Sequence, residues 1–67
     1  MSVSLNRVRF LIVDDNTHAV NLVKAMLRGF GADQLYDAQT VDAAKRRMKM
    51  TPCDIVILDY MRNAEEG

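Results

Sequence analysis

The sequence lacks a second cysteine, any tryptophan and any net charge. Its 67 residues include one cysteine, one proline and three glycines, and nine basic side chains balance nine acidic ones. A lone cysteine cannot form an intrachain disulfide and has no companion at a metal-ligand spacing, which excludes a disulfide scaffold and a zinc module. Zero formal charge also excludes a general attraction to nucleic acid or to an anionic membrane.

Long hydrophobic runs are also absent. The first apolar run covers only residues 10–13, which is too short for a signal-peptide core or a membrane span. We therefore expect a cytoplasmic protein in a reducing compartment. The length allows one domain, residues 1–67, whose small core leaves only about 3–5 kcal/mol of net stability.

Apolar periodicity predicts three strands and two helices. Residues 8–13 and 55–58 are short β-branched runs typical of strands, and residues 35–38 form a weaker strand candidate. The run over 10–13 does not alternate with polar residues, so we expect both of its faces to be covered, as in a parallel sheet. The tail, residues 59–67, is expected to be a loop. The order strand-helix-strand-helix-strand predicts an α/β fold with three parallel strands.

Two amphipathic helices are expected, over residues 17–30 and 41–50. The first should be capped by Asn16 or Thr17 and end at Gly29 and Gly31, and the second should be capped by Thr40. Their expected apolar stripes are listed here: Val20, Val23, Leu27 and Phe30 in the first helix, joined by Ala19, Leu22 and Met26, and Val41, Ala44 and Met48 in the second. Pro52 is expected to close the second helix.

Acidic residues follow two of the strands directly. Asp14 and Asp15 follow the first strand and Asp59 follows the third. If these strands are neighbours, the three carboxylates meet at the carboxyl edge of the sheet, where ligands bind in such folds. Clustered carboxylates repel one another and favour a hard cation such as Mg²⁺. The alternative is that these aspartates only form turns or cap helices.

These acidic motifs resemble the receiver domain of two-component response regulators. The resemblance rests on residues 10–16 (FLIVDDN) and 54–61 (DIVILDYM) and extends over 8–67. It implies a flavodoxin-like doubly wound fold in which Asp59 accepts a phosphoryl group from a histidine kinase or phosphotransfer protein. It also implies that Asp15 binds Mg²⁺ directly, that Asp14 assists through a water, and that the backbone carbonyl of Met61 is a further ligand. Such a domain is a signalling phosphoacceptor rather than an enzyme.

The chain departs from the receiver pattern after Asp59. Receivers have five strand-helix units in strand order 2-1-3-4-5, whereas three strands and two helices are expected here. No serine, threonine or lysine follows Asp59, and Arg62 and Asn63 stand where receivers usually have Met-Pro. We therefore expect an N-terminal portion of a receiver, lacking the C-terminal strands and helices or completed by another chain. Its third strand would form an open edge available for self-association or strand exchange.

Two other functions remain open from the sequence. One is a receiver-like interaction domain that does not switch by phosphorylation. The other is a Mg²⁺-dependent phosphohydrolase, but such enzymes use a second aspartate two positions after the nucleophile, and Asn16 occupies that position after Asp14. His18 and the basic residues over 45–49 are expected on solvated helix faces, so neither a histidine site nor nucleic acid binding is predicted.

Overall fold

A computed structural model describes residues 5–58 of the chain. The expected loop over 59–67, which includes Asp59 and Met61, lies outside the described residues. The elements, in chain order, are a short 3-10 turn (Leu5–Arg7), β1 (Arg9–Val13), α1 (Thr17–Gly29), β2 (Gln34–Ala38), α2 (Val41–Met50) and β3 (Ile55–Leu58). Neither helix of this described part is long and apolar enough to cross a membrane.

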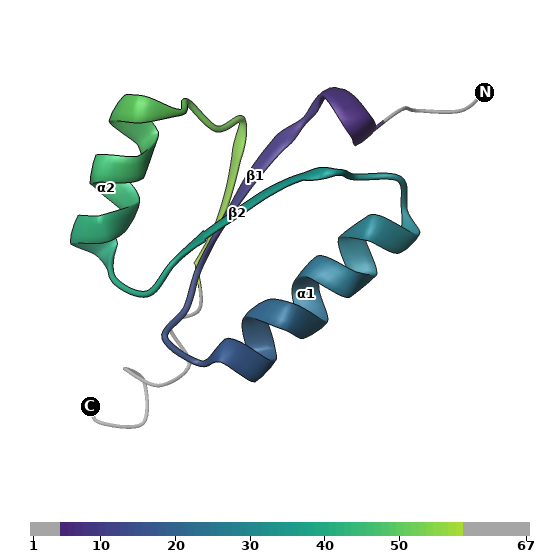
Figure 1. Cartoon of the computed structure of the whole chain (residues 1–67), viewed down its shortest axis with the longest axis horizontal. Coiled ribbons are helices and arrows are strands. Elements are labelled where there is room, and N and C mark those ends of the chain that lie inside the picture. The colour runs from purple at the N-terminus through teal and green to yellow at the C-terminus, as the bar shows by residue number, and fades with distance from the viewer. Residues whose placement is uncertain (1–4, 59–67) are drawn as a thin grey trace.

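The three strands form one parallel sheet with β1 in the centre. The strand order is β2-β1-β3, and both pairings are parallel. The two helices lie on opposite sides of the sheet (Figure 1). The structure is therefore a three-layer α/β domain, and the α/β fold with three parallel strands predicted from the sequence is confirmed.

The core is built around β1. Four consecutive residues of this strand, 10–13, are buried, and Leu11 has no exposed surface. Leu11 and Val13 face α2, where they form a cluster with Ala38 and Ala44. Because side chains alternate along a strand, Phe10 and Ile12 point to the other face, which α1 covers. The expectation that both faces of this strand are covered is thus confirmed.

Each helix begins at a side-chain cap. The amide oxygen of Asn16 accepts a hydrogen bond from the Ala19 N–H (3.2 Å), and the Thr40 hydroxyl accepts one from the Ala43 N–H (3.1 Å). Both bonds satisfy an N–H that the first helical turn leaves without a partner. Of the two caps considered for α1, Asn16 is therefore the correct one, and Thr40 caps α2 as predicted.

The C-terminus of α1 depends on Gly31. Its φ angle is +103°, a backbone conformation that residues with a Cβ rarely adopt. The Gly31 N–H donates to the Arg28 carbonyl and the Ala32 N–H to the Leu27 carbonyl, both at 3.0 Å. This pair of bonds is a Schellman motif, which ends the helix and turns the chain towards β2.

The two glycines at this end are expected to respond in opposite ways to alanine. Gly31→Ala should lower the free energy of unfolding by about 1–2 kcal/mol, because it forces a Cβ into the left-handed region. Gly29→Ala should leave stability unchanged or raise it by up to about 1 kcal/mol, because Gly29 is helical and a Cβ there would meet nothing within 4 Å. Urea unfolding in dilute solution measures the free energy of unfolding of both variants. An equal loss of stability in Gly31→Ala and Gly29→Ala would contradict the role of Gly31 in ending the helix.

Several apolar residues expected in the core are exposed instead. Phe30 is 71% exposed because it lies beyond the last helical residue, so its predicted burial is wrong. Leu22 and Met26, which the sequence joins to the apolar stripe of α1, are exposed as well. Val41 and Met48 are also exposed, and Ala44 is the one buried residue of the predicted α2 stripe. In β3, Ile55, Val56 and Leu58 are exposed, and within residues 5–58 this strand pairs with β1 alone. The predicted open edge is therefore found in the described part of the chain.

Candidate functional site

The carboxyl ends of β1 and β3 lie side by side. Val13, the last residue of β1, is the register partner of Leu58, the last residue of β3. Asp14 follows Val13 by one peptide bond, and Asp59 follows Leu58 by one peptide bond. The acidic residues can meet only if these two strands are neighbours, and this condition is fulfilled.

This edge is also the topological switch point of the sheet. From β1 the chain crosses to β2 on one side, and β3 then pairs on the other side of β1. In open parallel sheets the crevice at such a point, beyond the carboxyl ends of the strands, is where ligands bind. The loop that carries Asp14 and Asp15 lies at this position.

Asp14 is held in place by two hydrogen bonds. Its N–H donates to the Ala38 carbonyl at the end of β2 (3.0 Å), and its Oδ1 accepts from the Asn16 N–H (2.9 Å). The second bond closes an Asx turn, so the turn-forming role considered from the sequence is real for Asp14. The side chain is half-buried, whereas Asp15 is exposed. The turn fixes one carboxylate at the strand end and leaves the next facing solvent.

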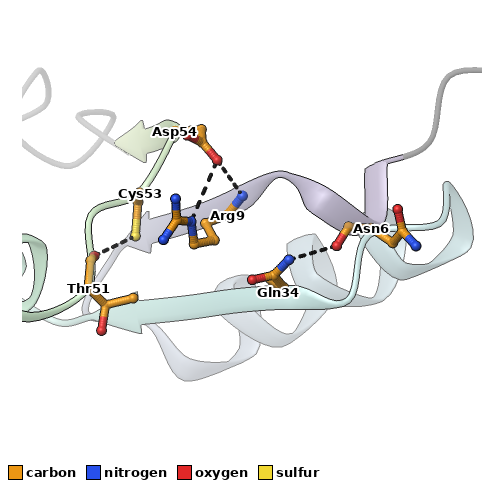
Figure 2. A network of polar contacts seen from close by, with 6 residues as sticks. All are labelled: Asn6, Arg9, Gln34, Thr51, Cys53 and Asp54. Atoms are coloured by element: carbon orange, nitrogen blue, oxygen red, sulfur yellow. Dashed lines mark hydrogen bonds and ion pairs between the residues drawn. The ribbon is translucent and has the colours of Figure 1, made fainter.

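A contact at the opposite end of the strands fixes their register. The Asp54 N–H donates to the Arg9 carbonyl (2.8 Å), and the Arg9 N–H donates to Asp54 Oδ2 (2.9 Å). The Arg9 guanidinium lies 3.8 Å from the same oxygen (Figure 2), but this ion pair is exposed and contributes little. These two hydrogen bonds, one between backbone groups and one from the Arg9 N–H to the Asp54 carboxylate, align β1 with β3 and thereby bring Val13 level with Leu58.

Among residues 5–58, the carboxylates of Asp14 and Asp15 are the side chains at this edge that could bind Mg²⁺. Within residues 5–58, no three His, Cys, Asp or Glu side chains are grouped so that they could hold a metal. Asp14 and Asp15 offer only oxygen ligands, the type that Mg²⁺ prefers. Magnesium is commonly held by one or two carboxylates together with waters and phosphate oxygens, so this pair is compatible with it. The other expected ligands, Asp59 and Met61, lie outside the described residues.

Most of the other charged residues discussed from the sequence lie exposed on the helices, and one of them joins two elements. His18 is exposed in the first turn of α1, as expected, and Lys45, Arg46 and Lys49 are exposed on α2. Arg47 lies over the Tyr36 ring at 5.5 Å from its centroid, which attaches α2 to β2. Neither this contact nor the role of Asp54 was predicted from the sequence. An acidic residue directly before a strand was the available signal for Asp54, but its partner is 45 residues away.

Comparisons of the chain with models of protein families, with curated protein sequences and with solved structures found no match. The assignment of a function therefore rests on the residues and the geometry described above.

Proposed function

We propose that the chain is the N-terminal part of a receiver domain and that Asp59 accepts a phosphoryl group from a histidine kinase or a phosphotransfer protein. One observation carries this proposal: Val13 and Leu58, which directly precede Asp14 and Asp59, are register partners on adjacent parallel strands. The strand order β2-β1-β3 agrees with the first three strands of the order 2-1-3-4-5 that the resemblance implies.

The chemistry suits these residue types. A carboxylate oxygen of Asp59 attacks the phosphorus of a phosphohistidine, an oxygen–phosphorus bond forms, and the phosphorus–nitrogen bond breaks. The electron pair of that bond stays on the imidazole, which takes up a proton from solvent. The product on this chain is an acyl phosphate.

The acidic loop after β1 would bind the cation that offsets the negative charges of the carboxylate and the phosphoryl group. Asp14 and Asp15 would hold Mg²⁺, with Asp59 and the Met61 carbonyl as further ligands. When bound there, Mg²⁺ would supply positive charge beside the phosphoryl oxygens and would so lower the electrostatic barrier to attack by an anionic carboxylate. The Asn16 bond to Asp14 Oδ1 positions that carboxylate before any ligand arrives.

A receiver-like interaction domain is the second candidate. The exposure of Ile55, Val56 and Leu58 favours it, since exposed contiguous apolar surface commonly marks a protein interface. The two functions differ in one outcome, which is whether the chain becomes phosphorylated.

Phosphorylation is tested with acetyl phosphate, a small acyl phosphate donor, in the presence of Mg²⁺. We expect the intact mass to rise by one phosphoryl group, and the added mass to be lost on treatment with hydroxylamine, which cleaves acyl phosphates. Chelation of the metal with EDTA should abolish the modification.

Asp59→Asn should remain unmodified, because an amide oxygen is a poor nucleophile. Asp33→Asn is the matched control, since Asp33 is an exposed aspartate in the loop before β2, and it should be phosphorylated like the unaltered chain. An unmodified wild-type chain, or one still modified after Asp59→Asn, would overturn the phosphoacceptor proposal. The first result would favour the interaction domain.

A further inference from the structure

Asn16 joins the acidic loop to α1 through both its backbone and its side chain. Its N–H donates to Asp14 Oδ1 at 2.9 Å, and its amide oxygen accepts from the Ala19 N–H at 3.2 Å. Its carbonyl also accepts a helical bond from the Val20 N–H, at 3.0 Å. One residue therefore holds a carboxylate of the candidate metal site on one side and the first turn of a helix on the other.

The first turn of α1 depends strongly on this side chain. An acidic residue in the first turn also stabilises a helix, through the partial positive charge at the helix N-terminus. The first turn of α2 contains Asp42, whereas the first turn of α1 contains no acidic residue. Loss of the Asn16 side chain would remove the partner of the Ala19 N–H with no such residue in the turn to compensate, so the start of α1 would fray.

The direction of the Asp14 carboxylate depends on the conformation of Asn16. The main chain of Asp14 is attached to the sheet, since its N–H donates to the Ala38 carbonyl at the end of β2 (3.0 Å). Its carboxylate is oriented by the Asn16 N–H, and the direction of that N–H relative to α1 is set by the φ and ψ of Asn16 (−95° and 109°). A capping residue has such an extended backbone. The cap and the Asx turn therefore require the same conformation of the same residue.

Resting on the function proposed above, we propose that the side chain of Asn16 is a positioning group for the Mg²⁺ site. By capping α1 it fixes the N–H that orients Asp14, and it anchors the loop in which Asp15 lies between two held residues. The affinity of the acidic loop for the cation is thereby coupled to the order of the first turn of α1.

Two general rules give the size and the symmetry of this coupling. Removing a hydrogen-bond partner of a metal ligand commonly lowers metal affinity about 10–100-fold. Coupling between two binding events is also reciprocal. The factor by which the cap strengthens metal binding is therefore the factor by which metal binding at Asp14 and Asp15 strengthens the cap.

Affinity is tested by titrating the whole chain with Mn²⁺, whose free form is measured by electron paramagnetic resonance. Asn16→Gly should lower the affinity about tenfold, the low end of the range for such partners. Glycine is tolerated at a helix cap with little loss of stability, so this variant stays folded. Asn16→Ser restores a capping oxygen and should bind Mn²⁺ within about twofold of the unaltered chain.

Thr40→Ala is the matched control. It removes a cap of the same kind, the bond from the Ala43 N–H to the Thr40 hydroxyl (3.1 Å), but at the start of α2. This variant loses more stability than Asn16→Gly, yet its affinity for Mn²⁺ should equal that of the unaltered chain. Circular dichroism at the temperature of the titration confirms that each variant is folded.

Hydrogen exchange measures the same coupling from the helix. With saturating Mg²⁺, exchange of the Ala19 N–H should slow by about the factor found for metal affinity, because the coupling is reciprocal. Exchange of the Ala43 N–H, which the Thr40 hydroxyl holds in α2, should slow less. In Asn16→Gly the effect of Mg²⁺ on the Ala19 N–H should disappear.

The outcomes separate this inference from the proposed function. A wild-type chain that binds no Mn²⁺ would overturn both. A wild-type chain that binds Mn²⁺ no more tightly than Asn16→Gly would overturn the role of Asn16 alone. Equal weakening in Asn16→Gly and Thr40→Ala, or a loss of affinity that Asn16→Ser does not restore, would also overturn it, since either result would show that the capping oxygen does not position the site.

Discussion

Replacing Leu11 by alanine is expected to unfold most of the chain at room temperature. Leu11 is the one large side chain in residues 5–58 with essentially no exposed surface, and it contacts the cluster that joins β1, β2 and α2. Leucine-to-alanine changes in cores cost about 2–5 kcal/mol, while a domain of this size has about 3–5 kcal/mol in total. The loss is therefore comparable to the whole stability of the domain.

Leu22→Ala is the matched control for this substitution. Leu22 is exposed on α1, and alanine has the higher helix propensity, so the free energy of unfolding should change by less than about 0.5 kcal/mol. Both variants are compared by urea unfolding in dilute solution, followed by circular dichroism. A Leu11→Ala chain as stable as the Leu22→Ala chain would contradict the position of the core.

Magnesium is expected to stabilise the folded chain strongly. A ligand that binds only the folded state at a hundredfold excess over its Kd adds about 2.7 kcal/mol. For a domain of this size each kcal/mol raises Tm by about 4–8 °C, so we expect an increase of about 10–20 °C. The physical reason is that the cation removes the repulsion among carboxylates at the carboxyl edge of the sheet.

The shift in Tm should depend on specific aspartates. Asp15→Asn should abolish most of the increase, because it removes a proposed direct ligand, whereas Asp33→Asn should preserve it. Thermal unfolding at several Mg²⁺ concentrations measures the effect, with matched NaCl to correct for ionic strength. An equal increase in both variants would show that Mg²⁺ acts by general screening rather than at this edge.

The local structure could be predicted well because its signals are local. The bounds of α2 and β3 agree with the residues expected from periodicity, and those of α1, β1 and β2 differ from expectation by one residue at one end. Thr40 caps the start of α2 and Gly31 ends α1, each through a hydrogen bond to a residue three positions away. Such contacts are encoded in short sequence segments.

Long-range features could not be derived in the same way. Nothing in the sequence shows that Arg9 and Asp54 align β1 with β3, because that contact joins residues 45 positions apart. Periodicity identified Val41 and Phe30 as apolar positions, but burial depends on whether another element covers them. From the sequence, the pairing of β1 with β3 could only be assumed, and the structure shows that these strands pair.

The candidate site was predicted in part. The Asx turn and position of Asp14 follow from residues 14–16, and the pairing of Val13 with Leu58 places the two relevant strand ends together. The convergence of Asp14, Asp15 and Asp59 around one cation stays a prediction, since Asp59 lies outside the described residues.

Paramagnetic broadening by Mn²⁺ tests this convergence most directly. Mn²⁺ substitutes for Mg²⁺ at oxygen sites, and it broadens amide resonances close to it in a ¹H–¹⁵N spectrum. We expect substoichiometric Mn²⁺ to erase the amide signals of residues 14–15 and 59 together, and excess Mg²⁺ to restore them. The signals of Asp33 and Asp54, acidic residues near the amino ends of β2 and β3, should remain sharp. Broadening of Asp14 and Asp15 without Asp59, or of Asp33 and Asp54 to the same extent, would contradict a shared metal site.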